Sequence, residues 1–352
     1  MGKKMEFDLA EFRKIRIPSE PEIMAGWRGD FGRPIVTVLC STYNQDIYIE
    51  DAIRGILIQK TDFPFEVIIH DDASTDRTAE IVLEYAKRYP NLIKPILQKE
   101  NQHKLGNKPS SLSLPSAKGD YIAWCEGDDF WIKKDKLCKQ LEAARKYNCD
   151  LVFTSASILS GRSIIGRMSD HYDKSRVVSL KQVVFGGGAY CPTPSLFIAK
   201  QTVACVLKQE WFRTAPVGDV FFQAAGAARF GAYFIAEDTC VYRTFARGSW
   251  TAKRRTYEEI DGALERMIIS IEGLASILGD NSKALSRQML ANTYYLHGLH
   301  HLKERNYISF SSCMTQANQL VEERSKGFAL FCRLRTFPRL ARFLASCTIF
   351  SP

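Results

Sequence analysis

The sequence predicts an α/β fold, a mostly parallel sheet with helices on both faces, followed by a C-terminal helical region. Short apolar runs rich in β-branched residues, such as Ile35 to Cys40, alternate with segments of helical period. Polar clusters follow several of these runs, and strand signals disappear after residue 257. Alternating strands and helices favour a parallel sheet, because each helix carries the chain back to start the next strand.

The expected elements follow one another at the short spacing of βαβ units. Segment 158–178 is weakly patterned and is expected to be a loop or a hairpin, and 233–243 to form one or two edge strands. The remaining strands are expected at 35–40, 65–69, 92–97, 121–125, 150–155 and 194–199, and the helices at 47–59, 78–89, 110–117, 136–147 and 217–230.

Changes in composition and in hydrophobic periodicity divide the chain into four parts. Residues 1–32 are a charged N-terminal extension, and 33–256 form the α/β domain. Residues 257–326 have helical periodicity throughout, enough for about three helices. Residues 327–352 form a basic, amphipathic tail.

The composition and net charge indicate which classes of binding partner to expect. The 352 residues are 45% hydrophobic and 25% charged, as in a soluble globular protein. The net charge of +9 suits an anionic partner such as a nucleotide or a phospholipid surface. Nucleic acid is not expected, because no recognised motif or basic stripe accompanies the charge.

Cysteine spacing and the N-terminus indicate the compartment. None of the ten cysteines has Cys-x-x-Cys spacing, which argues against a zinc site and favours a reduced, cytosolic chain. The first residues carry no apolar stretch of the secretory type, so no signal peptide is expected.

The stretch Glu126-Gly127-Asp128-Asp129 places three carboxylates within four residues, directly after an apolar strand. Their repulsion is costly unless a cation offsets it, and Mg²⁺ and Mn²⁺ choose carboxylate and phosphate oxygens. The stretch therefore suggests a metal–diphosphate site. The alternative is an acidic turn that caps the helix starting near Lys134.

Two further polar clusters favour the binding site. Residues 41–46 follow the first strand and residues 71–76 follow the second. In open parallel sheets, ligands bind outside the carboxyl ends of the strands. Three polar clusters at one edge are therefore better explained by one site than by three separate turns.

The tail combines four arginines with aromatic and aliphatic residues and has no acid after Gly327. Such a segment suits the surface of an anionic bilayer. Alternatively it is a docking helix that covers the protein's own core. Pro338 is expected to kink or divide it.

Together, the runs PIVTVLCSTYNQ, FEVIIHDDASTDRT and AKGDYIAWCEGDDFW resemble the nucleotide-binding half of family-2 glycosyltransferases. The resemblance covers roughly residues 34–250, and the motifs are specific in this combination and order. It implies a GT-A fold, a nucleotide-sugar donor, most simply a UDP-sugar, a Mg²⁺ or Mn²⁺ cofactor, and inverting transfer.

By position, the resemblance assigns the nucleotide to the first two clusters. Thr42, Tyr43 and Asn44 lie where the loop after strand one receives it. Asp71 and Asp72 occupy the places of the acids that meet the uracil ring and the ribose, with Asp72 favoured for the base.

Glu126-Gly127-Asp128 occupies the Asp-x-Asp position, which makes Asp128 the expected metal ligand. The role of Glu126 stays open between ribose contact and an outer-shell position, and Asp129 is expected to support the site. Trp131 either stacks on a sugar or packs beneath the acidic turn.

Asp219 lies in an element that resembles the one supplying the family's catalytic base, which takes the acceptor's proton. It also begins a helical pattern, so a capping role is the alternative. Thr193 and Ser195 match a segment that lines the donor or acceptor pocket.

Arg243 matches the arginine of a Tyr-Arg pair that, in many members, precedes a histidine two residues on, where this chain has Phe245. Arg243 or Arg247 is expected to reach the diphosphate instead, as arginine's fork allows, with Trp250 in the same stretch. The alternative for Arg243 is a structural ion pair.

The leading hypothesis is an inverting glycosyltransferase on the inner face of the cytoplasmic membrane. Its acceptor would be a saccharide, expected to be lipid-linked, in bacterial surface polysaccharide, lipopolysaccharide or capsule synthesis. A sugar nucleotidyltransferase is the rival enzyme, but residues 41–45 lack the glycine expected of its phosphate loop. A non-catalytic nucleotide-binding module is less consistent with the full set of acids.

Overall fold

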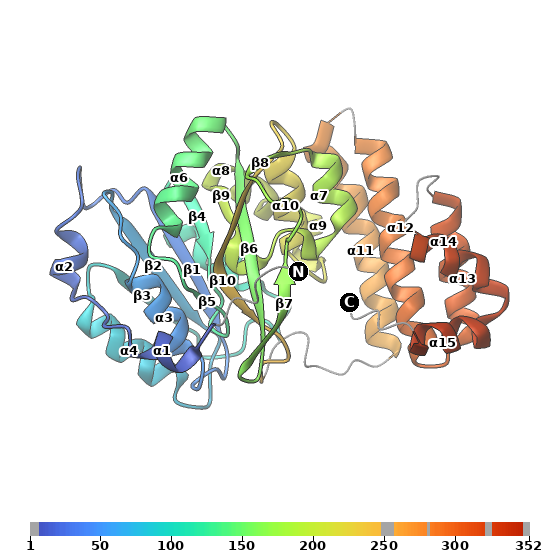
Figure 1. Cartoon of the computed structure of the whole chain (residues 1–352), viewed down its shortest axis with the longest axis horizontal. Helices are drawn as coiled ribbons and strands as arrows, with labels where there is room; N and C mark the ends of the chain where they lie inside the picture. The colour runs from blue at the N-terminus through green and yellow to red at the C-terminus, as the bar shows by residue number, and fades with distance from the viewer. Residues whose placement is uncertain (1–6, 248–256, 280–281, 321–325, 348–352) are drawn as a thin grey trace. The chain divides into compact units, whose positions relative to one another are not determined.

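The computed structural model describes residues 7–247, 257–279, 282–320 and 326–347. The chain divides into two compact units (Figure 1). The α/β unit comprises Met1–Arg213 and Asp219–Arg254, and the helical unit comprises Thr214–Gly218 and Arg255–Pro352.

The first half of the sheet is parallel and contains the point where strand order reverses. Strands β1 (Val36–Thr42), β2 (Phe65–Asp71) and β3 (Ile93–Leu97) run outward in sequence, and β4 (Tyr121–Trp124) returns to the other side of β1. The β1–β2 register ends with Thr42 opposite Asp71, so the loops after both strands leave the sheet at the same edge. Ligands of open α/β sheets bind at such a reversal.

The second half is mixed. β9 (Phe197–Ala199) runs antiparallel to both β4 and β6 (Leu151–Ser160), whereas β10 (Ala232–Arg243) runs parallel to β6. The overall order is β3-β2-β1-β4-β9-β6-β10-β5, with β5 at Phe130–Trp131. The expected α/β architecture with a mostly parallel sheet is confirmed.

Two expectations for the second half resolve differently. Segment 158–178 contains a hairpin, in which β6 pairs antiparallel with β7 (Ser163–Met168), and then β8 (Arg176–Val178). The expected edge position of 233–243 is wrong, because β10 is a single strand between β6 and β5. Its polar residues at 237–239 fall where the β6 register shifts, and this bulge made a central strand resemble an edge strand.

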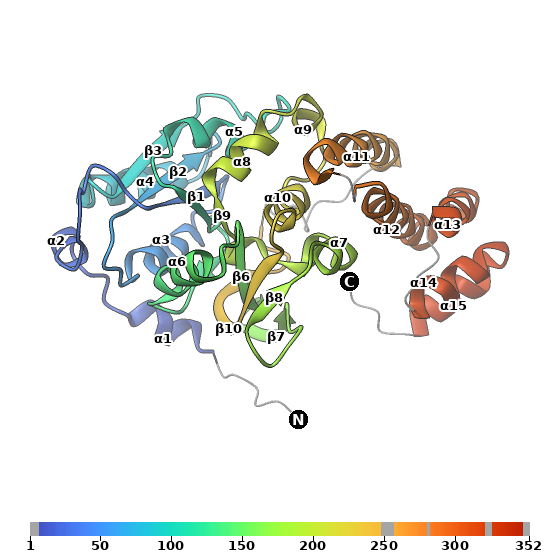
Figure 2. The same cartoon turned by 90° about the horizontal axis from the view of Figure 1, so that it is seen from above.

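Helices cover both faces of the sheet (Figure 2). On one face Ile53, Val82 and Leu141 pack with Val38 and Val67 in a single core. On the other face Trp124 of β4 contacts Phe222, with ring centroids 5.4 Å apart. The helices are α3 (Ile49–Leu57), α4 (Thr78–Arg88), α5 (Pro109–Ser113), α6 (Lys136–Tyr147), α7 (Leu180–Gly186), α8 (Lys200–Leu207), α9 (Glu210–Thr214) and α10 (Asp219–Ala227).

The N-terminal extension packs on the α/β unit through two short helices, α1 (Leu9–Lys14) and α2 (Glu20–Met24). Phe12 of α1 is buried, and its ring lies 4.8 Å from that of Phe130. Because Phe130 directly follows the acidic stretch, the extension reaches the underside of the candidate site.

The helical unit contains α11 (Tyr257–Leu278), α12 (Ser282–Lys303) and α13 (Tyr307–Leu320), as the periodicity predicts. The tail follows as α14 (Lys326–Arg333) and α15 (Pro338–Cys347), divided just before Pro338. In the part of the chain that the structure describes, no helix is both long and apolar enough to cross a membrane.

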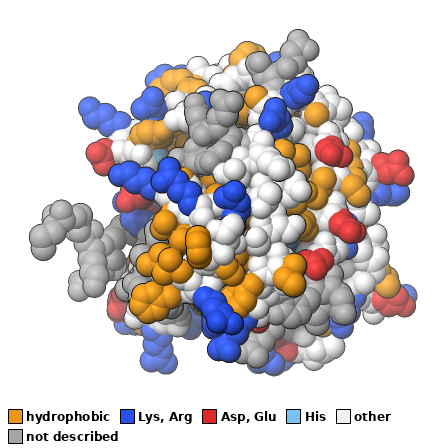
Figure 3. Space-filling view, turned by 90° about the vertical axis from the view of Figure 1, so that its right-hand side faces the viewer, with side chains coloured by type: hydrophobic (Ala, Val, Ile, Leu, Met, Phe, Trp, Pro, Cys, Tyr) orange, Lys and Arg blue, Asp and Glu red, His pale blue; other side chains and the backbone are white. Residues whose placement is uncertain are grey.

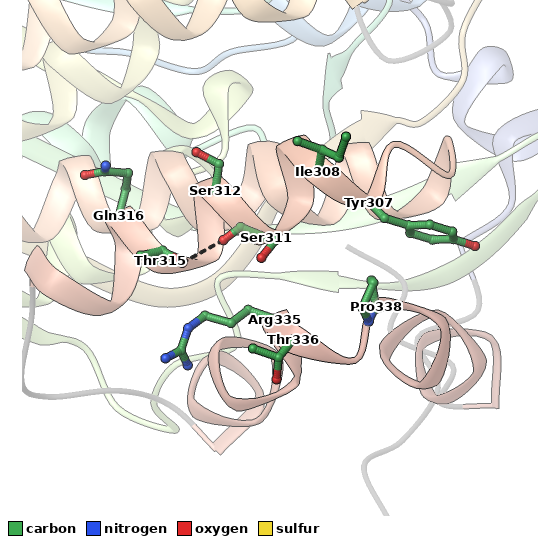
Figure 4. A pocket seen from close by; sticks show the side chains of 9 residues that line it. All are labelled: Tyr307, Ile308, Ser311, Ser312, Thr315, Gln316, Arg335, Thr336 and Pro338. Carbon is green, nitrogen blue, oxygen red and sulfur yellow. Dashed lines mark hydrogen bonds between the residues drawn. The ribbon is translucent and has the colours of Figure 1, made fainter.

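The tail is part of the core of its unit. Phe328, Phe331 and Ala341 are buried in one cluster with Phe310 and Met314 of α13. Between α13 and the tail lies an open cavity of about 620 Å³ (Figure 4). It is lined by Tyr307, Ile308, Ser311, Ser312, Thr315, Gln316, Arg335, Thr336 and Pro338.

Candidate functional site

The loops after β1 and β2 are tied to each other. Asn44 has a positive φ of 53°, its N–H donates to Ser74 Oγ at 2.9 Å, and its Oδ1 accepts from the Thr75 N–H at 2.8 Å. The Gln45 N–H donates to Thr78 Oγ1 at 2.8 Å. The structure thus brings the first two polar clusters together, with Asn44 as the link.

Asp71 and Asp72 are buried, and the protein itself supplies donors to all four carboxylate oxygens. Asp71 accepts from the backbone N–H and the hydroxyl of Ser74, at 3.0 and 2.5 Å. Asp72 accepts from the backbone N–H groups of Gln102 and His103, at 2.7 and 3.1 Å. This acid pair therefore holds two loops in place.

The third cluster converges at the end of β4. One carboxylate oxygen from each of Glu126, Asp128 and Asp129 lies within 4.8 Å of the others. A Cβ at Gly127 would lie 2.4 Å from Gln45 Oε1 and 2.7 Å from Thr42 Oγ1. Both distances are shorter than real Cβ contacts, so the close approach of the first loop requires glycine between the first two acids.

Burial and mutual repulsion raise the pKa values of these acids. Burial, followed by the charges of Asp128 and Asp219, raises the pKa of Glu126 to about 8. Burial also raises the pKa of Asp128, and that of Asp129 well above the usual range. Buried carboxylates without enough partners take up protons unless a cation is near.

The donor set fits a hard divalent cation. The Oδ2 atom of Asp129 is buried and has no hydrogen-bond partner among the described residues, and Glu126 keeps partial exposure toward solvent. Three converging carboxylates with one unsatisfied oxygen match the oxygen ligands that Mg²⁺ and Mn²⁺ prefer. The residues present are thus able to hold such an ion.

Asp219 lies beside this cluster at the start of α10. Its Oδ1 accepts from the N–H of the next residue, Val220, at 2.8 Å, and its charge raises the pKa of Glu126. Burial raises the pKa of Asp219 itself, opposed by the Val220 hydrogen bond, the Lys108 charge and a Thr193 hydrogen bond. The Val220 contact is not the bond of an N-cap, which would reach the N–H two or three residues on, so what the structure shows for Asp219 is its place at the acid cluster.

Two of the candidate residues lie beneath the site. Trp131 is fully buried; its Nε1–H donates to the Pro194 carbonyl at 2.8 Å, and Lys136 Nζ lies 4.1 Å from the ring. Ser195 is also fully buried, and its hydroxyl donates to the Pro192 carbonyl at 2.7 Å. Both side chains are therefore part of the interior, and their polar atoms are already bonded within the protein.

The two arginine candidates differ in burial and in partners. Arg243 is buried and donates from Nη2 to Asp51 Oδ2 at 2.5 Å. This is a structural ion pair of the kind expected as the alternative role of Arg243. Arg247 is exposed, and its backbone N–H donates to Tyr48 Oη at 3.4 Å. Trp250 lies outside the described residues.

Sequence reasoning missed several polar residues around the acid cluster. Gln45 forms a side-chain hydrogen bond with Asp128, and Asp51 and Arg13 form the ion pairs behind Arg243. Asp51 lies among the apolar residues of α3. An acid on a helix face that is expected to be buried indicates a buried ionic partner, and this was the signal in the sequence. Lys108, which is not among the predicted site residues, is half-buried, and its charge lowers the pKa of Asp219.

Comparison with known proteins identifies the domain that carries this site. Residues 37–187 match the sequence model of the family described as glycosyl transferase family 2. The chain carries a glycosyl transferase family 2 domain. The match includes the loops after β1 and β2 and the whole acid cluster, so the predicted family is confirmed for residues 37–187.

Curated relatives are similar over parts of their length. An uncharacterized protein of Mycobacterium tuberculosis, Rv1520, is 48% identical over 107 residues, 30% of each chain. TuaG of Bacillus subtilis, whose name provisionally assigns it to teichuronic acid biosynthesis as a glycosyltransferase, is 36% identical over 39% of this chain and 50% of its own. The matched part thus spans at most half of these relatives.

A solved structure shares the fold. Residues 1–349 of Staphylococcus aureus TarS in complex with UDP-GlcNAc align with a TM-score of 0.61 over 88% of this chain and 87% of that one. Sequence identity in this alignment is 18%, so the likeness concerns the fold alone. TarS is named as a poly(ribitol-phosphate) β-N-acetylglucosaminyltransferase. The expected GT-A fold with a C-terminal helical region is confirmed.

Proposed function

We propose that the chain is an inverting glycosyltransferase that transfers a sugar from a UDP-sugar donor to a saccharide acceptor with the help of Mg²⁺ or Mn²⁺. The observation that carries the proposal is the convergence of Glu126, Asp128 and Asp129, with Asp219 beside them, at the strand-order reversal of the sheet. A nucleotide diphosphate and a carboxylate base are needed together at one place for this reaction.

Each proposed role follows from a position. Asn44 and the Asp71–Asp72 pair lie on the loops that would receive the nucleotide, together with Thr42 and Tyr43. Each carboxylate oxygen that already accepts one hydrogen bond retains a second lone pair for the ligand. We therefore expect uracil and ribose to lie against these loops.

Asp128 and its neighbours would hold the metal ion. A bound divalent ion supplies positive charge that stabilises the departing diphosphate. Asp128 lies between Glu126, which is partly exposed, and Asp129, which has one buried oxygen without a described partner. An ion bound by Asp128 would therefore interact with all three carboxylates.

Asp219 is the proposed base. Inverting transfer displaces the diphosphate from the anomeric carbon in one step, and a carboxylate takes the proton of the acceptor hydroxyl as the new bond forms. Burial raises the pKa of Asp219, which brings it closer to neutral pH and strengthens it as a base. Thr193, hydrogen-bonded to Asp219, would keep the carboxylate in place.

Titration with UDP tests the donor site. UDP is expected to bind this protein more tightly in the presence of Mn²⁺ than in the presence of EDTA, measured by calorimetry. Equal affinity under both conditions would overturn the metal's role. A screen of nucleotide sugars for metal-dependent hydrolysis then identifies the donor.

The acceptor is proposed to be a lipid-linked saccharide of a surface polysaccharide, lipopolysaccharide or capsule, used at the inner face of the cytoplasmic membrane. The relatives named for teichuronic acid and poly(ribitol-phosphate) support a cell-surface polymer. The tail supports a membrane surface, because it exposes one apolar and basic side while its other side is buried in the helical unit.

We call this exposed side the tail patch. Its apolar members are 41–63% exposed and lie among arginines on a side of the molecule where apolar and basic side chains gather (Figure 3). Interfacial helices bury such apolar residues among lipid headgroups and bind anionic lipid through arginine. The tail patch comprises Leu330, Phe337, Leu340 and Phe343 with Arg333, Arg335, Arg339 and Arg342.

Point variants test the tail patch better than a deletion, because a deletion would also remove Phe328 and Phe331 from the core. The double variant Phe337→Ser/Phe343→Ser is expected to lose binding to vesicles containing anionic phospholipid in a flotation assay. Phe230→Ser, which changes an exposed phenylalanine of the α/β unit, is the matched control. Unchanged flotation of the double variant would refute the membrane role.

A further inference from the structure

The acid cluster is anchored from behind by a chain of ion pairs that reaches the N-terminal extension. We propose that Arg243 is a positioning residue for the metal site, and that Arg13 of the extension holds Arg243 in place through Asp51. The inference rests on the proposed metal-dependent function. It assigns to Arg243 the shaping of the acid cluster in place of contact with the diphosphate.

Arg243 contacts both aspartates of the cluster. Its Nη1–H donates to the main-chain carbonyl of Asp128 at 2.6 Å, and its backbone N–H donates to Asp129 Oδ1 at 2.8 Å. The first bond fixes the turn that carries Asp128. The second bond occupies one oxygen of Asp129 and thereby directs the other, Oδ2, to the place where it has no described partner.

Asp51 holds the far side of the guanidinium. Arg243 Nη2 donates to Asp51 Oδ2 at 2.5 Å, and Arg13 grips the same carboxylate from Nε to Oδ1 and from Nη2 to Oδ2, both at 2.8 Å. The side chains of Arg243 and Asp51 are only 6% and 3% exposed. Buried charges are costly unless their geometry is good and their hydrogen bonds are filled, and here two arginines fill one carboxylate.

Aromatic rings fix the plane of the guanidinium. Its central carbon lies 4.6 Å from the ring centroid of Phe130 and 4.9 Å from that of Tyr48. Phe130 in turn packs on Phe12 of the extension. Lysine has no planar fork, so it would not satisfy Asp128 and Asp51 at once while stacking on these rings.

The guanidinium of Arg243 also brings a positive charge to the back of the acid cluster, since it bonds the main-chain carbonyl of Asp128. A fixed cation at this place offsets part of the repulsion among the three carboxylates.

A purely structural ion pair makes a different prediction from a positioning role. A structural pair would affect folding and every binding property together. A positioning residue affects the contribution of the metal and leaves the metal-free nucleotide site unchanged. The ratio of UDP affinity with saturating Mn²⁺ to UDP affinity with EDTA isolates that contribution, because it is the coupling between metal and nucleotide.

Calorimetric titrations of Arg243→Lys and Arg13→Ala measure this ratio in the full-length protein. Arg243→Lys is expected to lower it about tenfold, the lower end for partners that orient metal ligands. Arg13→Ala is expected to lower it about threefold, as suits a half-exposed ion pair. Arg16→Ala, which breaks the exposed Arg16–Glu22 pair of the same extension, should leave the ratio unchanged, and Arg13→Lys should restore part of it.

The outcomes separate the two proposals. If the wild-type protein binds UDP much more tightly with Mn²⁺ than with EDTA and both variants keep the same affinity ratio, the positioning role alone is overturned. A variant that loses metal-free UDP affinity without a change in the affinity ratio would overturn it as well. A wild-type ratio of one would remove the metal-dependent function and the positioning role with it. If Arg243→Lys fails to fold, Arg13→Ala decides the question, because Arg13 is half-exposed.

Discussion

Two acidic clusters at the same edge of the sheet differ in what satisfies their carboxylates. Asp71 and Asp72 follow β2 and receive hydrogen bonds from Ser74, Gln102 and His103. Glu126, Asp128 and Asp129 follow β4, crowd together within 4.8 Å and leave one buried oxygen without a described partner. Protein donors satisfy each oxygen of the first cluster once and leave it free to accept a further bond from the nucleotide, whereas the second cluster is left crowded and in need of a cation.

The difference separates carboxylates that also hold loops in place from carboxylates that require a cation. Satisfied buried carboxylates stabilise the loops that they organise. Crowded carboxylates with raised pKa values destabilise the protein when no cation is bound. Evolution tolerates this loss of stability where cation binding is needed for function, because the bound cation removes it. A pair of adjacent acids in the sequence looks the same in both cases.

The largest expected effect concerns Asp219, which borders the second cluster. Asp219→Asn should lower kcat about 10³-fold, within the usual contribution of a general base, and should leave UDP affinity unchanged. Asparagine keeps an acceptor oxygen for the Val220 N–H, so folding should survive. Steady-state kinetics with the identified donor measure the effect. Glu210→Gln at the start of α9 is the control. A nearly wild-type kcat for Asp219→Asn would show that Asp219 is not the base.

The two clusters should respond oppositely to the same change of acid to amide. Asp128→Asn is expected to abolish the Mn²⁺ dependence of UDP affinity with little loss of stability. Asp72→Asn should lower the free energy of unfolding by about 1–3 kcal/mol, because one backbone donor then faces an amide nitrogen. Thermal denaturation and calorimetry of both variants test this. The comparison fails if Asp72→Asn leaves the melting temperature unchanged or Asp128→Asn keeps the metal dependence.

A smaller effect should follow pH. The folded-state pKa of Glu126, about 8, lies above its ordinary value of 4.5, so the stability linked to its proton is full below pH 4.5 and is lost as pH rises to about 8. Glu126→Gln should therefore raise the metal-free melting temperature by about 2–4 °C at pH 8, as about 1 kcal/mol does in a domain of this size, and not at pH 4.5. Glu84→Gln, an exposed acid of α4, is the control. Equal shifts at both pH values would show that Glu126 does not titrate as described.

The sequence by itself determined the element types and the edge of the sheet that carries the site. The β-branched runs at β1, β2 and β4 and the helical periods between them are local patterns, and a parallel sheet brings the carboxyl ends of its strands together. These patterns therefore predict that Asn44, Asp72 and Asp128 lie at one edge of the sheet. The helical periods after residue 257 are local in the same sense.

Only the tertiary structure decided which acids have partners. The backbone donors to Asp72 come from residues 102 and 103, and the carboxylate that holds Arg243 lies 192 residues earlier, on α3. The insertion of β10 between β6 and β5, which brings Arg243 to the acids, was likewise hidden by its polar bulge. Hydrogen bonds and buried charge depend on distances between segments remote in sequence, and no local pattern records those distances.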